Sequence, residues 1–475
     1  MASGRVRELS INTVLFAISS FGSKLVSFLL LPLYTSALST ADYGTVDLVQ
    51  STVSLLIPVF TLNVQDAVLR FGLGRDGEPE EVLSVGLRTV AGGCCVLLLA
   101  LAAVVGLNVT PVDDVYLAFL FAMFLLGAMS NVLTMYLKSR NHIKALVVSG
   151  IGGTLVTCVL AIALLVGVSA GVVGYMAAMA SGNLFSVCVL LVAGRVSLRA
   201  VFRSQQGLFR AMVAYSAPLI ANSLAWWVND VSGRYVVTLL CGAAANGVYA
   251  VAFKIPSILS TLQTVFYNAW SISAIKEFDP KDSDGFLGRM YSLYSCAMSL
   301  CCSIILLLDI PLARLLYADD FFGAWHYVPF LLVGVFLNGL ALFEGCIYAA
   351  ARHTKEVSAT TLAGAIVGIV ACIVLTFFIG PMGAAVATFA GYLVTWGVRT
   401  RIMVRSVARI KVPWRIEIAC LCILIVQAAL ATQEGMQLIQ LSIFAALVVV
   451  QRKNISQVIG VLSQKRTACG RSRAE

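Results

Sequence analysis

The chain has 475 residues, of which 60% are hydrophobic and only 12% are charged, and its mean hydropathy is +0.93. Soluble domains carry about 25% charged residues, so this composition excludes an ordinary soluble protein and indicates a polytopic membrane protein. The formal net charge of +10 would suit a nucleic-acid ligand, but the positions of the basic residues give it another origin.

Apolar stretches long enough to cross a bilayer, which takes about 20 residues, occur about fourteen times. The connections between them are short, so we expect no soluble domain. The predicted segments lie near residues 9–37, 43–69, 84–106, 115–137, 145–168, 171–193, 212–240, 245–273, 288–309, 326–350, 357–379, 382–403, 415–431 and 436–451.

The basic residues predict the orientation of the chain. With a cytoplasmic N-terminus, most of the 33 Lys and Arg residues fall in inside segments, Arg399 among them, and only Arg314 falls in an outside loop. This distribution follows the positive-inside rule, and an even number of helices places both termini in the cytoplasm. The basic excess is therefore an orientation signal and a contact for anionic lipid, and we expect no nucleic-acid partner.

The residues that carry metal and cofactor chemistry are sparse or buried in apolar runs. Most of the 13 Cys lie in such runs without a CxxC motif, and the 3 His lie near segment ends. We therefore expect small buried thiols, no metal site, no cofactor and no catalytic residue.

Two short stretches predict that the chain consists of two similar halves. Residues 41–46 open the second predicted helix and residues 244–249 open the eighth, with a Gly-aromatic pattern in each. Six helices separate the two points, which predicts parallel repeats, a transporter architecture. The predicted parts are an N-terminal six-helix lobe (1–194), a basic cytoplasmic linker (195–211), a C-terminal six-helix lobe (212–404), and two additional helices with a basic tail (405–475).

Prolines in both halves predict bent helices. Pro32 and Pro58 interrupt the first two predicted helices, and Pro218 and Pro256 interrupt the seventh and eighth. Proline removes a backbone hydrogen bond and kinks a helix. Bent helices at matching places suit a protein that alternates between two conformations, although static kinks for packing remain an alternative.

Three cationic residues lie inside predicted spans: Lys24, Arg234 and Lys254. A charge at the bilayer centre costs about 2.5–3.5 kcal/mol on insertion scales, so such residues face a bundle interior or a wet cavity and mark functional sites. Two structural alternatives stay open. Lys24 could bind carbonyl groups at a tight helix contact, and Arg234 could form an ion pair with Asp230, four residues earlier on the same helix face.

Other polar residues add to the predicted lining of a cavity. Asn268 and Trp226 are candidate substrate contacts, and Asp47 is a candidate ion-coupling group. Glu344 is the best candidate for a titrating group, although packing or a partner Lys would explain it equally well.

Several motifs resemble one transporter family. Residues 29–35 followed by 38–44, with the sequence A-D-Y-G at the end, resemble the opening signature of Wzx-type polysaccharide flippases. These belong to the superfamily that includes the MATE exporters and the lipid II flippases. Many members have Ser-Asp-Arg where this chain has Ser232–Arg234, so Gly233 departs from the pattern, and Asp230 is a candidate substitute acid.

The resemblance implies an all-α, MATE/MOP-like protein of the bacterial cytoplasmic membrane. It would move undecaprenyl-pyrophosphate-linked sugar repeats to the outer leaflet for surface polysaccharide biosynthesis. A lumen bearing Lys24, Arg234 and Lys254 would hold the pyrophosphate while two lobes rock in alternating access.

The expected partners are the lipid-linked oligosaccharide and membrane lipid. Coupling to H⁺ or Na⁺ is left open, as is contact with a polysaccharide polymerase or glycosyltransferases. The alternatives are a lipid II flippase or a MATE-like multidrug or ion antiporter, against which the basic lumen argues. A membrane-embedded glycosyltransferase or polymerase fits less well, because the outside loops are short.

Overall fold

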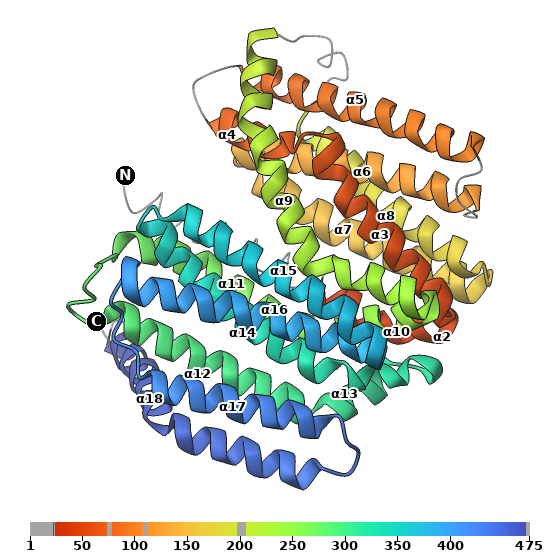
Figure 1. The fold of residues 1–475 in the computed structure, drawn as a ribbon. Helices are drawn as coiled ribbons and strands as arrows, with labels where there is room; N and C mark the ends of the chain where they lie inside the picture. The colour runs from red at the N-terminus through yellow and green to blue at the C-terminus, as the bar shows by residue number, and fades with distance from the viewer. Residues whose placement is uncertain (1–21, 23, 74–77, 108–112, 197–205, 472–475) are drawn as a thin grey trace. The chain divides into compact units, whose positions relative to one another are not determined.

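The computed structural model describes residues 22, 24–73, 78–107, 113–196 and 206–471, and within these ranges the regular structure is entirely helical. The chain divides into two compact units, Met1–Val231 and Ser232–Glu475 (Figure 1). Unit 1 and unit 2 denote these two parts below. The predicted all-α membrane architecture is confirmed.

The number of spans is close to the predicted number. Among the described residues, 12 helices are long and apolar enough to cross a membrane, or 13 if one bent pair counts as a single span. Residues 9–21 and 23 of the first predicted segment lie outside the described residues, and Lys24–Ala37 is a shorter apolar helix. The multi-pass character is therefore established, whereas the exact count of fourteen is not confirmed.

Unit 1 is a helical bundle in which α8 packs on both α7 and α6, and α6 contacts α3, α4 and α5. Ser39 caps α3, because its hydroxyl accepts a hydrogen bond from the Asp42 backbone N–H. The helices of this unit are α2 (Leu31–Ala37), α3 (Thr40–Phe60), α4 (Val64–Leu73), α5 (Pro79–Gly106), α6 (Asp114–Ser139), α7 (Ile143–Ile162, followed by the π-helical turn Ala163–Gly167), α8 (Gly171–Ala193) and the first part of α9 (Gln206–Cys241).

Unit 2 contains the end of α9 and the remaining helices. Within it, α16 packs on α15 and α14, and α14 packs on α11. The helices are α10 (Ala243–Ala252), α11 (Pro256–Lys276), α12 (Phe286–Leu307), α13 (Asp309–Leu316), η3 (Asp319–His326), α14 (Val328–Ala350), α15 (Thr354–Ile379), α16 (Pro381–Ile402), η4 (Met403–Val407), α17 (Trp414–Ala431) and α18 (Gln437–Arg471).

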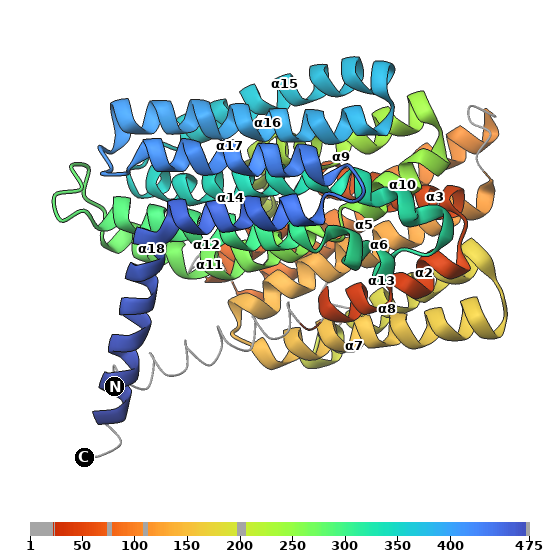
Figure 2. The same cartoon turned by 90° about the horizontal axis from the view of Figure 1, so that it is seen from below.

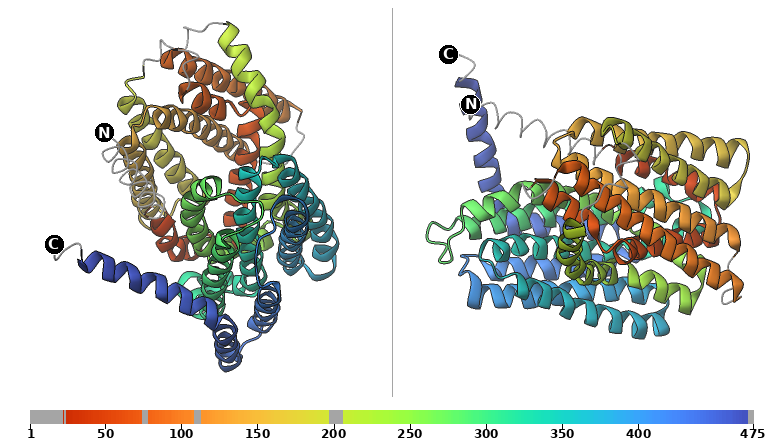
Figure 3. Two further views of the ribbon diagram at one scale, coloured as in Figure 1. Left: turned by 90° about the vertical axis from the view of Figure 1, so that its left-hand side faces the viewer. Right: turned by 90° about the horizontal axis from the view of Figure 1, so that it is seen from above.

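The last two helices, α17 and α18, stand beside α12 in unit 2. Each of them packs on α12, and they pack on each other. Figures 2 and 3 show that the final turns of α18 project away from the other helices of this unit.

The same kind of helix seam occurs in both units. In unit 1, a Cβ on Gly182 of α8 would overlap Thr157 Oγ1 and lie 2.6 Å from the Gly153 carbonyl oxygen of α7. In unit 2, a Cβ on Gly364 of α15 would overlap Thr395 Oγ1 and lie 2.6 Å from the Gly391 carbonyl oxygen of α16. Glycine lets the two backbones of each pair approach closely, which is how helices associate in lipid.

Two of the four prolines stand at breaks between helices. The break after α3 follows Pro58, and the α10–α11 pair bends by 47° just before Pro256. Pro32 is the second residue of α2. Pro218 lies inside α9, which stays helical on both sides of it, so a bend at this residue remains a prediction.

Candidate functional site

One predicted cation contacts the bend of unit 2, and a second belongs to the bend itself. The guanidinium carbon of Arg234, on α9, lies 5.3 Å from the centre of the Phe253 ring. Phe253 begins the three-residue break between α10 and α11, and Lys254 is the next residue. Both cationic side chains are half-buried. A cation at this distance from an aromatic ring is attracted by about 0.5–2 kcal/mol, depending on how far it is desolvated.

The bend exists because Pro256, at the first position of α11, has no backbone N–H and cannot continue the backbone hydrogen bonds of α10. The chain turns tightly instead, with the Lys254 N–H donating to the Val251 carbonyl oxygen at 2.9 Å. The Ser257 hydroxyl then donates to the Lys254 carbonyl oxygen at 2.5 Å. Lys254 is thus held at a fixed point in the middle of a broken apolar pair of helices.

Gly233 adjoins this bend. A Cβ there would lie 3.2 Å from the Tyr249 hydroxyl of α10 and 3.8 Å from Cys372 Sγ of α15. The Tyr249 hydroxyl is 3.3 Å from Thr388 Oγ1. The Cβ of an Asp at this position would lie close to the Tyr249 hydroxyl, and glycine leaves this space open.

The remaining substrate candidates are less enclosed. Asp230 and Lys24, in unit 1, are exposed, and Asn268, in unit 2, is exposed on α11. Trp226 and Asp47 are half-buried in unit 1. A lumen shared by the cations of both units stays a prediction.

Glu344 lies in a different environment from the one expected for a lumen group. Its side chain, on α14, is 0% exposed. The Thr400 hydroxyl of α16 donates to Glu344 Oε1 at 2.6 Å, whereas Oε2 is buried without a hydrogen-bond partner among the described residues. A half-satisfied buried carboxylate is costly, which keeps Glu344 a candidate for a group that binds or releases a cation.

Arg399 of α16 is a buried cation that the sequence pattern missed. It is 3% exposed, and its guanidinium donates four hydrogen bonds to α14 and α15. The acceptors are the Ala341 carbonyl oxygen (2.8 Å), the Val357 carbonyl oxygen (3.0 Å), Thr360 Oγ1 (3.0 Å) and Thr361 Oγ1 (2.7 Å).

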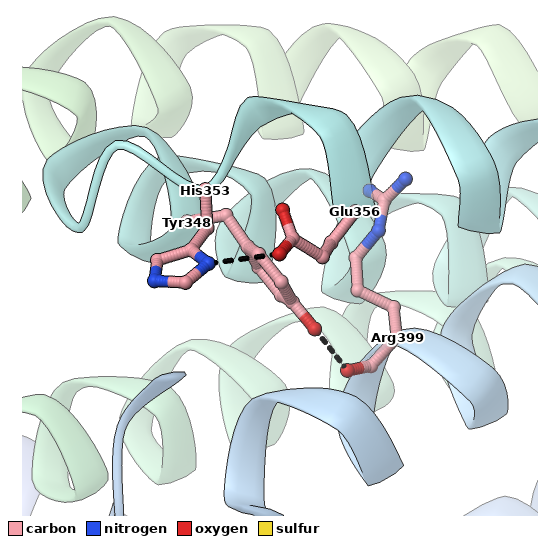
Figure 4. A network of polar contacts seen from close by, with 4 residues as sticks. All are labelled: Tyr348, His353, Glu356 and Arg399. Carbon is pink, nitrogen blue, oxygen red and sulfur yellow. Dashed lines mark hydrogen bonds and ion pairs between the residues drawn. The ribbon is translucent and has the colours of Figure 1, made fainter. Parts of the chain in front are cut away.

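Figure 4 shows the neighbours of Arg399 at the ends of α14 and α15. The Tyr348 hydroxyl donates to the Arg399 carbonyl oxygen at 2.7 Å. Nearby, His353 Nδ1 lies 2.9 Å from Glu356 Oε1. The hydrogen bonds of the Arg399 side chain join α16 to α14 and α15, so this residue holds three helices together. The positive-inside rule had placed Arg399 among the charges of the inside segments. The only feature of the sequence that pointed to a buried position was that Arg399 lies within a predicted helix.

A second set of buried polar groups joins α12 to α17 and α18. Serines four residues apart on α12 provide the contacts: Ser295 donates to Glu417 Oε2, and Ser303 donates to Gln427 Oε1 at 2.6 Å. The Gln451 amide lies 3.5 Å from Ser299 Oγ. Because polar groups in lipid must find partners within the protein, this ladder fixes the two additional helices on unit 2.

The described part of the chain holds no group of three or more His, Cys, Asp or Glu residues arranged around an ion. The cysteines described there are free thiols.

The comparison with protein families identifies the chain. A family model for polysaccharide biosynthesis proteins matches residues 9–271. The match covers more than half of the chain, which therefore belongs to this family. No curated protein matches the chain.

Solved structures show the fold. An inward-facing multidrug resistance MATE family transporter of the MOP superfamily has a TM-score of 0.64 at 14% identity, over 81% of this chain and 96% of the transporter. The lipid II flippase MurJ, in an inward closed conformation, has a TM-score of 0.64 at 11% identity, over 94% of this chain and 99% of the flippase. A MATE transporter of Vibrio cholerae has a TM-score of 0.53 at 15% identity, over 85% of this chain and 98% of the transporter. The predicted MATE/MOP-like fold is confirmed.

Proposed function

We propose that this protein is a flippase that moves polyprenyl-pyrophosphate-linked oligosaccharide units across the bacterial cytoplasmic membrane. The family links the chain to polysaccharide biosynthesis, and the fold is one that transporters use. A pyrophosphate cannot cross hydrocarbon unaided, so a protein of this family and fold needs buried cations to receive it.

One observation carries the proposal: the guanidinium of Arg234 contacts the ring of Phe253 at the bend in unit 2, the bend to which Lys254 also belongs. Arg234 sits over Phe253, and Lys254 follows that ring in the chain. Arg binds phosphate oxygens through a planar fork of donors, and Lys adds a compact charge. In the proposed mechanism Arg234 and Lys254 bind the pyrophosphate, and Lys24, Asp230, Asn268 and Trp226 are the further substrate contacts that the sequence predicts.

The driving force belongs to the proposal as well. A gradient of H⁺ or Na⁺ would act at an intramembrane carboxylate, for which Glu344 and Asp47 are the candidates. Glu344 is favoured because one of its oxygens is buried without a hydrogen-bond partner in the described residues. Polymerase or glycosyltransferase partners would supply and consume the lipid-linked unit.

A drug exporter of the same fold is the main rival. A site for cationic drugs needs an excess of acidic groups, whereas the bend of unit 2 carries Arg234 and Lys254. We therefore favour an anionic head group over a cationic drug as the cargo.

The proposal can be tested by complementation of a strain that depends on this protein for its surface glycan. Lys24→Ala, Arg234→Ala and Lys254→Ala should each reduce surface glycan about tenfold, as expected for the loss of a charge-assisted contact worth about 1.4 kcal/mol. The matched control is Lys276→Ala, because Lys276 is an exposed cation at the end of α11. The amount of protein in the membrane should be equal for all four variants. Wild-type glycan levels in all three test variants would reject the proposal.

A further inference from the structure

A small cavity lies at one end of unit 2, where α12 passes into α13 and α17 turns into α18. Its volume is about 20 Å³, and its lining includes Leu307, Asp309, Ala431, Met436 and Gln440. A cavity needs roughly 10–15 Å³ to hold one water molecule, so this one accommodates a single water-sized occupant.

The cavity contains polar atoms that the protein leaves unsatisfied. Asp309 is 1% exposed and Gln440 is 5% exposed. Both carboxylate oxygens of Asp309 and the amide oxygen of Gln440 are buried without hydrogen-bond partners in the described structure. The Gln440 amide nitrogen donates to the Gln427 carbonyl oxygen at 3.1 Å, which fixes the identity of its free oxygen.

A purely structural role for Asp309 would leave a different pattern. The large majority of buried side-chain polar atoms have a hydrogen-bond partner. Asp309 is the first residue of α13, directly after the N-cap residue Leu308, and neither of its oxygens accepts a hydrogen bond in the described structure. Burying three oxygen acceptors around one void without a donor or cation is costly.

We propose that this cavity binds a monovalent cation of the size of Na⁺, held by the Asp309 carboxylate and the Gln440 amide oxygen. The ligands are hard oxygens, which suit alkali and alkaline-earth cations rather than softer metals. One carboxylate balances one positive charge, whereas Ca²⁺ takes six to eight oxygen ligands.

The bound cation would join two parts of unit 2. Asp309 follows α12 and opens α13, and Gln440 lies in the first turns of α18. A cation between them would tie the α17–α18 hairpin to α12 at this end, as the buried ladder of Ser295, Ser299 and Ser303 ties it along its length. The site does not depend on the proposed cargo.

The test is thermal unfolding of the purified full-length protein in NaCl and in N-methyl-D-glucamine chloride at equal ionic strength. A ligand that binds only the folded state raises the midpoint as its concentration rises. We expect Na⁺ to raise the wild-type midpoint and to have no effect on Asp309→Asn. Asp320→Asn is the matched control, since Asp320 is an exposed acid nearby in the chain, and it should keep the full shift.

A second variant covers the case in which Asp309→Asn does not fold. Gln440→Leu removes one ligand oxygen and leaves the carboxylate in place, so about tenfold more Na⁺ should be needed for the same shift. Equilibrium dialysis with ²²Na⁺ should find one ion fewer per chain in Asp309→Asn than in the wild type. The inference is overturned if wild-type stability is the same in both salts, or if both variants keep the wild-type response. Neither outcome bears on transport of a lipid-linked oligosaccharide.

Discussion

The guanidinium carbon of Arg234 lies 5.3 Å from the centre of the Phe253 ring, at the bend between α10 and α11. The same ring packs edge-on against Tyr249, with 5.2 Å between ring centres. A charged group is therefore held by an aromatic cluster in the middle of an apolar pair of helices. This arrangement stabilises the cation without neutralising it, which is what a binding site for an anion requires.

Replacing Phe253 tests whether the ring positions Arg234 for transport. Phe253→Leu keeps an apolar side chain but loses a cation–π attraction of about 0.5–2 kcal/mol, so transport should fall roughly twofold to thirtyfold. Phe253→Tyr keeps the ring face and should remain close to wild type. The measurement is the transport rate of each variant at equal amounts of membrane protein. A wild-type rate for Phe253→Leu would show that the ring does not act through Arg234.

Replacing Arg399 should weaken unit 2 itself. Arg399→Ala removes a buried charge that donates to two carbonyl oxygens and two threonine hydroxyls, and each buried acceptor left without a donor costs about 1–3 kcal/mol. Arg399→Lys should recover only part of this, because an ammonium cannot match the planar fork. The readout is the unfolding midpoint in detergent.

The control for Arg399 is Arg401→Ala, two residues later and exposed. This change should leave the midpoint within the range of an ordinary surface substitution, about 0.5 kcal/mol. Equal midpoints for Arg399→Ala and Arg401→Ala would contradict the clamp that we assign to Arg399.

The glycine seam between α15 and α16 offers a test of close helix packing. A methyl group on Gly364 would overlap Thr395 and the Gly391 carbonyl oxygen, so Gly364→Ala should destabilise the protein by about 1–3 kcal/mol. Gly397, in α16, has open space where a methyl group would lie, and Gly397→Ala should be neutral or stabilising, because alanine is the better helix former. If Gly364→Ala is as stable as Gly397→Ala in unfolding experiments, the two helices do not pack as described.

The sequence allowed the helices and the main bend to be predicted because their signals are local. Apolar length defined the spans, and Pro256 marked the break beside Lys254. The role of Arg399 could not be predicted, because its acceptors Ala341 and Val357 lie on helices far earlier in the chain. The same holds for Glu417, whose partner Ser295 is 122 residues away, and for the cavity at Asp309, which forms only when two helix junctions meet.

Asp309 makes one contribution to the pH dependence of the stability of unit 2. Burial raises the pKa of its carboxyl group well above the ordinary value of 3.8. A carboxyl group whose pKa is higher in the folded state stabilises the fold at low pH, and this contribution is lost as the pH rises from the ordinary value toward the raised one. Of the described residues that line the cavity, Asp309 alone is ionisable, while Arg314 and Glu434 nearby in the chain are exposed.

Sodium should therefore stabilise the protein more at high pH than at low pH, because it binds the ionised carboxylate and competes with the proton. Unfolding midpoints in sodium and N-methyl-D-glucamine salts across a pH series measure this difference. A sodium effect that is constant with pH, or that grows on acidification, would mean that Asp309 is not the ligand.

The most direct measurement is translocation in reconstituted vesicles. A fluorescent oligosaccharide linked to polyprenyl pyrophosphate would be placed in vesicles with the purified protein, and its arrival in the opposite leaflet would be followed by quenching from outside. We predict translocation by the wild type and by Lys276→Ala, and at least about tenfold slower translocation by Arg234→Ala and Lys254→Ala. Wild-type rates in both of these variants, or no translocation by the wild-type protein, would contradict a pyrophosphate site at the α10–α11 bend.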